Sequence, residues 1–149
     1  MTNFPKHPVV VYKIATKVPQ LILDADALLA AIQQYPALFV IPATVLTAID
    51  ANIQALENAE AAVIAGTGTA AARNIPLGLV VSDINMLKVV VQTAVNANPS
   101  QAADIAEKGG MRIKMTAIRQ KVVFHAKNTI TSGIVDLFAP GAPMRSFHE

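Results

Sequence analysis

The glycine-rich stretch AGTGTAAAR, residues 65–73, has the residue types in this sequence that most resemble a reactive site. Read loosely, Gly66, Gly68 and Ala71 match the GxGxxA turn that holds the pyrophosphate of a dinucleotide at a helix N-terminus. In that motif a buried strand comes before the first glycine, and an unbroken helix follows the last residue. Phosphate chemistry at this stretch therefore depends on the elements that flank it.

The flanking residues do not provide that arrangement. Residues 44–65 carry apolar side chains at helical spacing, so a helix precedes the first glycine where a strand is required. Downstream, Pro76 and Gly78 interrupt the helix that would receive the phosphates. A glycine just past a helix end suits a left-handed cap, and Thr67 or Thr69 can cap the helix that follows. We therefore expect a turn between two helices and no cofactor at this stretch.

Cysteine and histidine give no sign of a metal or redox site. The chain has no cysteines, which excludes disulfides, thiolate ligands and cysteine nucleophiles. The three histidines are His7, His125 and His148, and none has a ligand partner three or four residues away. We expect ordinary surface histidines and no bound metal.

Two pairs of carboxylates lie close together in the sequence. Asp24 and Asp26 are about 200° apart on a helix of 3.6 residues per turn, so they point to different sides. Glu57 and Glu60 share a side, and Glu60 falls on an apolar stripe, where it is either marginally exposed or paired. Neither pair has an acid–base partner within sequence reach. The sequence therefore predicts a protein that is not an enzyme.

The composition indicates a packed, soluble chain. Of its 149 residues 53% are hydrophobic and 15% are charged, which excludes an intrinsically disordered protein. The apolar excess lies in small aliphatic residues, which suit tightly packed helices and suggest that partners cover part of the apolar surface. The N-terminus lacks the apolar core of a signal peptide. No uncharged run reaches the roughly 20 residues of a membrane span, so we expect no span.

Basic residues gather towards the C-terminal end, and no acidic residue interrupts their run. The candidate contacts for a polyanion are Lys108, Arg112, Lys114, Arg119, Lys121 and Lys127. The net charge is only +2 and aromatic residues make up 5% of the chain. A nucleic-acid-binding surface normally combines a stronger charge with interleaved aromatic side chains. We therefore do not expect nucleic acid as a partner.

Apolar spacing, prolines and glycines predict an up-down four-helix bundle over residues 18–110. The first helix opens at residues 18–19, where a proline suits the first turn. It ends at Tyr35, because Pro36 disfavours helical geometry in the residue before it. A proline-bounded linker follows, and the second helix opens at residues 42–44.

The third helix of this predicted bundle is the most apolar. It runs from about residue 69 to residue 97, with a kink at Pro76. From Leu79 onward apolar residues spread around most of its circumference, which suggests burial on more than one side. A shorter fourth helix begins at Ser100 and ends at Gly109.

The two ends of the chain have the composition of extended segments. Residues 1–17 form an N-terminal arm with prolines and then a β-branched run. From residue 111 the pattern changes again, and residues 111–149 are typical of strands separated by turns. The predicted fold class is mainly α with a β-rich C-terminal tail (α+β).

The order of these pieces resembles a known family. The residues that carry the resemblance are Tyr35, Pro36, Phe39, Pro42 and Thr44 in the linker, Ala48, Ile49, Leu56, Glu57, Ala59 and Gly66 in the second helix, residues 70–73 in the third helix, and residues 109–111 at the final step. They are similar to the helical N-terminal domain of bacterial and phage-associated proteins that contain fibronectin type III domains. The family supplies no catalytic residues to carry over.

The tail extends this resemblance. The sequence NTITSGIVDLFAPGAPMRSFHE, residues 128–149, is similar to the opening strands of a fibronectin type III sandwich. A complete sandwich needs about 90–100 residues, whereas 39 follow Gly110. The resemblance therefore implies a partial sandwich, whose strands either pair with other subunits by strand addition or fold back along the bundle.

Together these patterns predict a non-catalytic structural or interaction subunit of a larger assembly, such as a phage virion or similar particle. We expect the partners to be protein subunits, including copies of this chain. The candidate intersubunit strands contain Val9, Val10, Val11 and Tyr12 in the arm, and Val122, Val123 and Phe124 in the tail. The alternative is a soluble binding module that recognises a small ligand, glycan or polyanion through the bundle or the basic tail.

Overall fold

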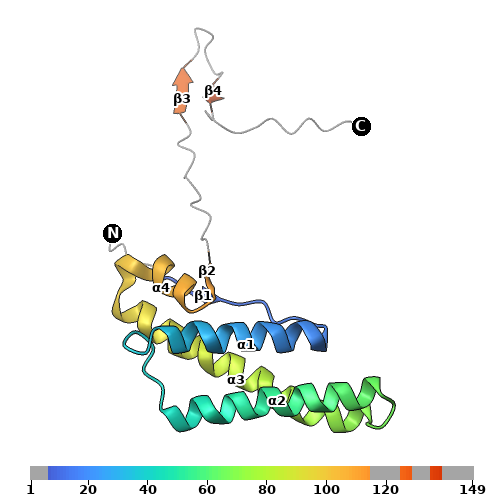
Figure 1. Cartoon of the computed structure of the whole chain (residues 1–149). Coiled ribbons are helices and arrows are strands. Elements are labelled where there is room, and N and C mark those ends of the chain that lie inside the picture. Colours follow the sequence, from blue (N-terminus) through green and yellow to red (C-terminus); the bar gives the residue numbers. More distant parts are fainter. Residues whose placement is uncertain (1–6, 115–124, 129–134, 139–149) are drawn as a thin grey trace, which may run out of the picture. The chain divides into compact units, whose positions relative to one another are not determined.

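The computed structural model of the protein describes residues 7–114, 125–128 and 135–138 (Figure 1). The chain divides into two compact units, residues 1–114 and residues 115–149.

The first unit is mainly helical, as predicted. Its helices are α1 (Val18–Gln34), α2 (Ala43–Ile64), α3 (Ala70–Ala97) and α4 (Ala102–Lys108), with a 3-10 turn, η1 (Pro99–Gln101), before α4. α2 packs against both α1 and α3, and α4 packs against α3. The three long helices therefore form the body of the bundle, and the seven-residue α4 lies at one end of it (Figure 1).

The helix ends lie within a residue or two of the predicted positions. α1 carries a proline in its first turn and is capped by Tyr35, whose backbone N–H donates to the carbonyl of Ile32. At the start of α3, the side chain of Thr69 accepts a hydrogen bond from the N–H of Ala72 at 3.2 Å. Pro76 lies inside α3, as predicted.

The glycine-rich stretch is a turn between two helices, which confirms the prediction. Gly66 has φ +74°, the left-handed conformation that favours glycine. The backbone N–H groups of Thr67 and Gly68 both donate to the carbonyl of Ala62, each at 2.9 Å. These bonds satisfy the end of α2 and turn the chain directly into α3. Because the helix α2 precedes the glycines, the strand that the dinucleotide motif requires at this place is absent.

One apolar core holds the first unit together. Among the described residues no polar or charged side chain is buried in it. Its largest fully buried side chains are Leu21, Ile32, Ile53, Leu56, Ile84, Leu87 and Ile105. Each sits on the apolar stripe of its helix, as expected when amphipathic helices bury one face against each other.

A small antiparallel sheet joins the two ends of the first unit. β1 (Val10–Val11) pairs with β2 (Arg112–Ile113), with Val10 opposite Ile113. Val10 is fully buried and belongs to the core. The compact unit therefore includes part of the arm and the residues up to 114, whereas the sequence placed the boundary after residue 110. Gly110, at φ +70°, turns the chain so that β2 lies beside β1.

The second unit contains one described β-hairpin. β3 (His125–Asn128) pairs antiparallel with β4 (Val135–Phe138), with His125 opposite Phe138. β structure in the tail is thus present, in the form of two four-residue strands. The candidate strand residues Val122, Val123 and Phe124 lie outside the described residues.

Candidate functional site

α3 exposes an apolar face to solvent, which we call the outer face. It consists of Ile75, Leu79, Ser82, Met86, Val89 and Thr93, all of them exposed. The exposed fraction is 72% for Ile75, 48% for Leu79 and 64% for Val89. At about 100° per residue these side chains fall within one narrow stripe.

The inner face of the same helix is the stripe that enters the core. It consists of Val80, Ile84, Leu87, Val91 and Val95, all of them buried. On a helix of 3.6 residues per turn its centre lies on the opposite side from that of the outer face. α3 therefore has two apolar faces, one packed inside the chain and one facing solvent. This geometry agrees with the spread of apolar residues seen in the sequence.

The outer face has the spacing of a helix-packing seam and carries no charge. Its members alternate in steps of four and three residues, which is the a/d repeat of helices that pack side by side. The charged residues of α3 lie off this stripe. Arg73 binds Glu60 of α2, Asp83 accepts a hydrogen bond from Asn52 of α2 at 2.8 Å, and Lys88 lies towards the inner side.

Gly78 lies next to the outer face in the interior of α3. A Cβ atom built on it would meet nothing within 4 Å, so nothing within the described part of this chain requires glycine there. Glycine in the middle of a helix costs roughly 0.5–1 kcal/mol relative to alanine. Together with Ser82, one turn further on, it makes the centre of the outer face unusually small.

A shallow groove extends the apolar surface at the C-terminal half of α3. It has a volume of about 310 Å³ and is lined by Leu38 and Val40 from the α1–α2 linker and by Val89, Val90, Thr93, Ala94 and Ala97 from α3. Val40 is 83% exposed, the largest value among the exposed apolar residues in the described part. The outer face is thus continuous with apolar surface on the linker.

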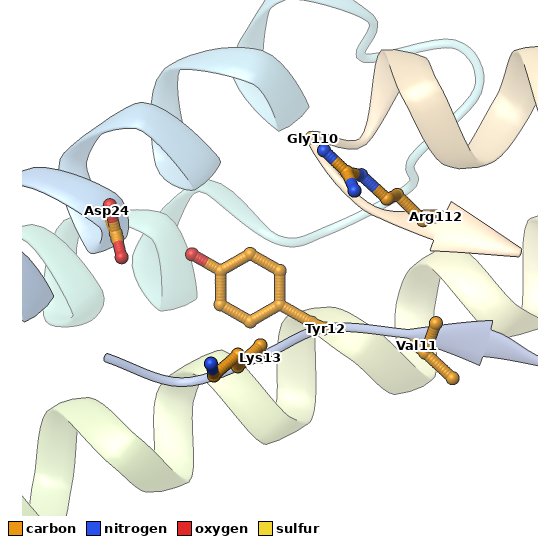
Figure 2. A pocket seen from close by; sticks show the side chains of 6 residues that line it. All are labelled: Val11, Tyr12, Lys13, Asp24, Gly110 and Arg112. Carbon is orange, nitrogen blue, oxygen red and sulfur yellow. The ribbon is translucent and has the colours of Figure 1, made fainter. Parts of the chain in front are cut away.

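A separate polar pocket lies between α1 and the small sheet (Figure 2). Its volume is about 570 Å³ and its lining residues are Val11, Tyr12, Lys13, Asp24, Gly110 and Arg112. Figure 2 shows the hydroxyl of Tyr12 pointing towards Asp24. An adjoining depression of about 420 Å³ shares Lys13 and Asp24 and continues towards Lys17. The lining residues come from three distant parts of the sequence.

The electrostatics of this pocket keep the hydroxyl of Tyr12 protonated. Burial raises the pKa of Tyr12, and the negative charge of Asp24 raises it further. The phenol therefore stays protonated at neutral pH and is a hydrogen-bond donor. The Asp24 carboxylate accepts a hydrogen bond from Nε2 of Gln20 at 2.7 Å. With the exposed cations Lys13 and Arg112, the pocket offers groups that can hold a small polar ligand.

Of the six sequence-predicted polyanion contacts, Lys108, Arg112 and Lys114 lie in the first unit and Lys127 in the second. Lys108 donates to Asp104 at 2.7 Å and lies 5.6 Å from the centre of the Tyr35 ring. The hydrogen bond to Asp104 is the main cause of its raised pKa. Arg112 is exposed on β2, Lys114 is exposed just after it, and Lys127 lies on β3. Arg119 and Lys121 lie outside the described residues.

The predicted intersubunit strand in the arm has partners within its own chain. Val9 accepts a hydrogen bond from the N–H of Lys114 at 2.7 Å, on the β2 side of β1. On the other side, the side-chain amide of Gln92 accepts from the N–H of Val10 at 2.7 Å and donates to the carbonyl of Pro8 at 2.9 Å. Gln92 thus takes the place of a neighbouring strand. Intersubunit pairing by residues 9–12 stays a prediction.

For Glu60 the sequence predicted either a marginally exposed or a paired side chain, and the structure shows it paired. Its carboxylate lies 3.0 Å from Nη1 of Arg73, and both side chains are mostly covered. The pair joins the end of α2 to the start of α3 across the glycine turn. Nε of Arg73 is buried and has no hydrogen-bond partner among the described residues.

Within the described ranges, no group of three or more histidine or acidic side chains is arranged to hold a metal ion. One described helix, α3, is long and apolar enough to cross a membrane, with a mean hydropathy of 1.5 over its most apolar window. Length and composition do not by themselves place a helix in a membrane, because core helices of soluble proteins share them. In α3 only 22% of that window is buried, which again reflects the outer face.

The sequence anticipated the apolar breadth of α3 better than it anticipated the polar pocket around Tyr12. The breadth of the apolar pattern in α3 predicted burial on more than one side, whereas within the described residues only its inner face is buried. The Tyr12–Asp24–Arg112 pocket had no sequence signal, because its residues meet only through the β1–β2 pairing.

No family model, curated protein or solved structure matches this chain. The resemblance to proteins with fibronectin type III domains therefore stays a prediction.

Proposed function

We propose that this protein is a non-catalytic structural or interaction subunit of a larger assembly and that it binds its neighbours through the outer face of α3. The observation that carries the proposal is the pair of opposite apolar faces on one helix. The inner face fills the place of α3 in the core, while the large apolar side chains of the outer face stay between 38% and 72% exposed. An uncharged apolar stripe in water is unfavourable, and a partner that covers it removes this cost.

The exposed apolar surface is large enough to matter for binding. The exposed fractions of Ile75, Leu79, Met86, Val89 and Val40 add up to about three whole side chains. Burying one aliphatic side chain contributes about 1.5–3 kcal/mol, so this surface offers about 5–9 kcal/mol. Association costs about 4–15 kcal/mol in lost freedom of motion. A partner that brings apolar surface of its own therefore gives a stable contact.

The tail provides a second contact in this proposal. A hairpin of two short strands is marginally stable alone in water. We propose that strands from other subunits pair with the β3–β4 hairpin and extend it into a larger sheet. This arrangement is expected of a particle built from many copies, such as a virion, and the resemblance noted in the sequence supports it.

Light scattering across a series of protein and salt concentrations tests the proposed function. We expect a defined oligomer whose mass does not change with salt, because apolar contacts are not screened. A protein that is monomeric at high concentration and melts in one ordinary cooperative transition would contradict the proposal.

The polar pocket supports a second candidate function, that of a binding module for a small ligand with an anionic group. Lys13 and Arg112 would hold the anion, and the Tyr12 hydroxyl would donate a hydrogen bond. Titration with inorganic phosphate and with acetate, followed by calorimetry, checks this candidate. We expect weak binding that Arg112→Gln abolishes and that falls with added salt, and heats equal to dilution would contradict it.

A further inference from the structure

We infer that the occupant of the outer face is a second copy of this chain, packed antiparallel through α3 about a two-fold axis near residues 80–81. This inference rests on the proposed function and names its partner.

The spacing of the outer face fits a helix as the occupant. Steps of four and three residues place side chains as knobs into the holes of a facing helix of the same kind. A flat lipid surface has no such requirement. Amphipathic helices that lie on membranes also carry Lys and Arg beside their apolar stripe, whereas the single lysine of α3, Lys88, lies towards the inner side.

The order of large and small residues makes the face complementary to itself. Along α3 the large side chains Ile75, Leu79 and Met86 alternate with the small residues Gly78 and Ser82. An antiparallel pair centred near residues 80–81 places Leu79 of one copy against Ser82 of the other, and Ile75 against Met86. A two-fold axis makes each of these contacts twice, as in most homodimers.

Gly78 gives this arrangement independent support. Its missing side chain faces open space within the described part of the chain, although glycine is unfavourable inside a helix. A small residue at the centre of a helix pair lets the two backbones approach closely. The outer face carries no charge, so two copies can meet without like charges opposing each other. The apolar surface of both copies is then buried, which exceeds what one copy offers to a polar partner.

The experiment compares Ser82→Arg with the wild type by light scattering on the full chain. Ser82 is exposed, so an arginine there leaves the core intact while it places a charge and bulk at the centre of the contact. The matched control is Ala51→Arg, at an exposed position of α2. We expect at least a tenfold weaker association for Ser82→Arg, an unchanged association for Ala51→Arg, and unchanged helical circular dichroism for both. Val89→Lys, at a second exposed position, provides a further variant with the same expected loss.

The outcomes separate this inference from the proposed function. A wild-type oligomer that Ser82→Arg and Val89→Lys leave intact overturns the α3 contact, yet it keeps the role as an assembly subunit. A wild-type monomer that does not sediment with phosphatidylcholine–phosphatidylglycerol vesicles overturns both. A wild-type monomer that does sediment with them overturns both in favour of a lipid surface.

The orientation is tested with single cysteines, since the chain has none of its own. With a short thiol-specific crosslinker we expect Ser82→Cys to form covalent dimers and Val89→Cys to form none. In the antiparallel pair the two copies of residue 89 lie about 25 Å apart along the axis, at 1.5 Å per residue. Equal crosslinking of both variants would indicate a parallel pair and overturn the proposed geometry.

Discussion

The two faces of α3 have similar side chains and different surroundings. Both are stripes of aliphatic residues at helical spacing, yet the inner face is fully buried and the outer face is exposed. The difference lies in their neighbours. α3 packs against α1, α2, α4 and β1 and its inner face is buried there, whereas the large apolar side chains of the outer face stay between 38% and 72% exposed. Apolar character alone therefore does not separate a core residue from a contact residue.

The comparison also shows what each face contributes. Residues of the inner face lose contacts within the chain when they are truncated, so their changes should appear in the free energy of unfolding. The large apolar residues of the outer face are only partly covered within the chain, so their changes should appear mainly in the association constant. Stability and association thus form two readouts that can be measured on the same variants.

The largest expected effect compares one substitution on both faces. Leu87 is 1% exposed and Leu79 is 48% exposed. We expect Leu87→Ala to lower the free energy of unfolding by about 2–5 kcal/mol, because it leaves a cavity in the core. Leu79→Ala should cost roughly 1 kcal/mol or less, since half of the side chain is already in water. Urea unfolding at low protein concentration measures both, and equal losses would contradict the assignment of the two faces.

The next effect concerns the ion pair that holds α3 against α2. Arg73→Met leaves the mostly covered carboxylate of Glu60 without its partner. We expect a loss of about 1–2 kcal/mol in the free energy of unfolding, between the values for exposed and buried pairs. The matched control is Lys108→Met, which breaks a more exposed pair within one helix and should change stability much less. If both variants melt alike, the Glu60–Arg73 contact does not hold the two helices together.

A smaller effect separates the two readouts in opposite directions. Gly78→Ala replaces a glycine whose added Cβ meets nothing within the chain. We expect the free energy of unfolding of the monomer to rise by about 0.5–1 kcal/mol, because alanine favours the helix more than glycine does. The same change should weaken association by severalfold, because the added methyl group separates the two backbones. Thermal melts measure the stability and light scattering measures the association, both on one sample. Stronger association together with a more stable monomer would contradict close packing of the two helices at Gly78.

The sequence predicted the fold where single residues have local effects. Pro36, Gly66 and Gly109 set helix ends through backbone geometry that holds in any context, so those ends were predictable. The buried stripe of α3 follows from helical spacing as well, since Val80, Ile84, Leu87, Val91 and Val95 recur every three or four residues. The breadth of the apolar pattern does not show that the opposite face stays exposed. The contact of Val10 with the core and the pocket around Tyr12 depend on the distant strand β2, and no local pattern encodes that pairing.

The smallest expected effect lies away from α3 and should change stability only. Burial raises the pKa of Asp26 above its ordinary value of 3.8, and the negative charges of Glu57 and Asp50 on α2 raise it further. The folded state therefore binds this proton more tightly than the unfolded state. The contribution of Asp26 to the free energy of unfolding rises as the pH falls through the raised pKa towards 3.8, and its ionised form is unfavourable at neutral pH.

The variant Asp26→Asn tests this effect. Its free energy of unfolding should be higher by about 0.2–0.5 kcal/mol at pH 7, the size of a like-charge pair on a helix surface. The gain should shrink as the pH falls through the raised pKa, because the wild type is then protonated as well. Added salt should also reduce it, since the side chain is largely exposed. Light scattering should show no change in association, because Asp26 lies on α1, away from the outer face. A gain that grows at low pH would reverse the sign and show that the ionised carboxylate stabilises the folded state.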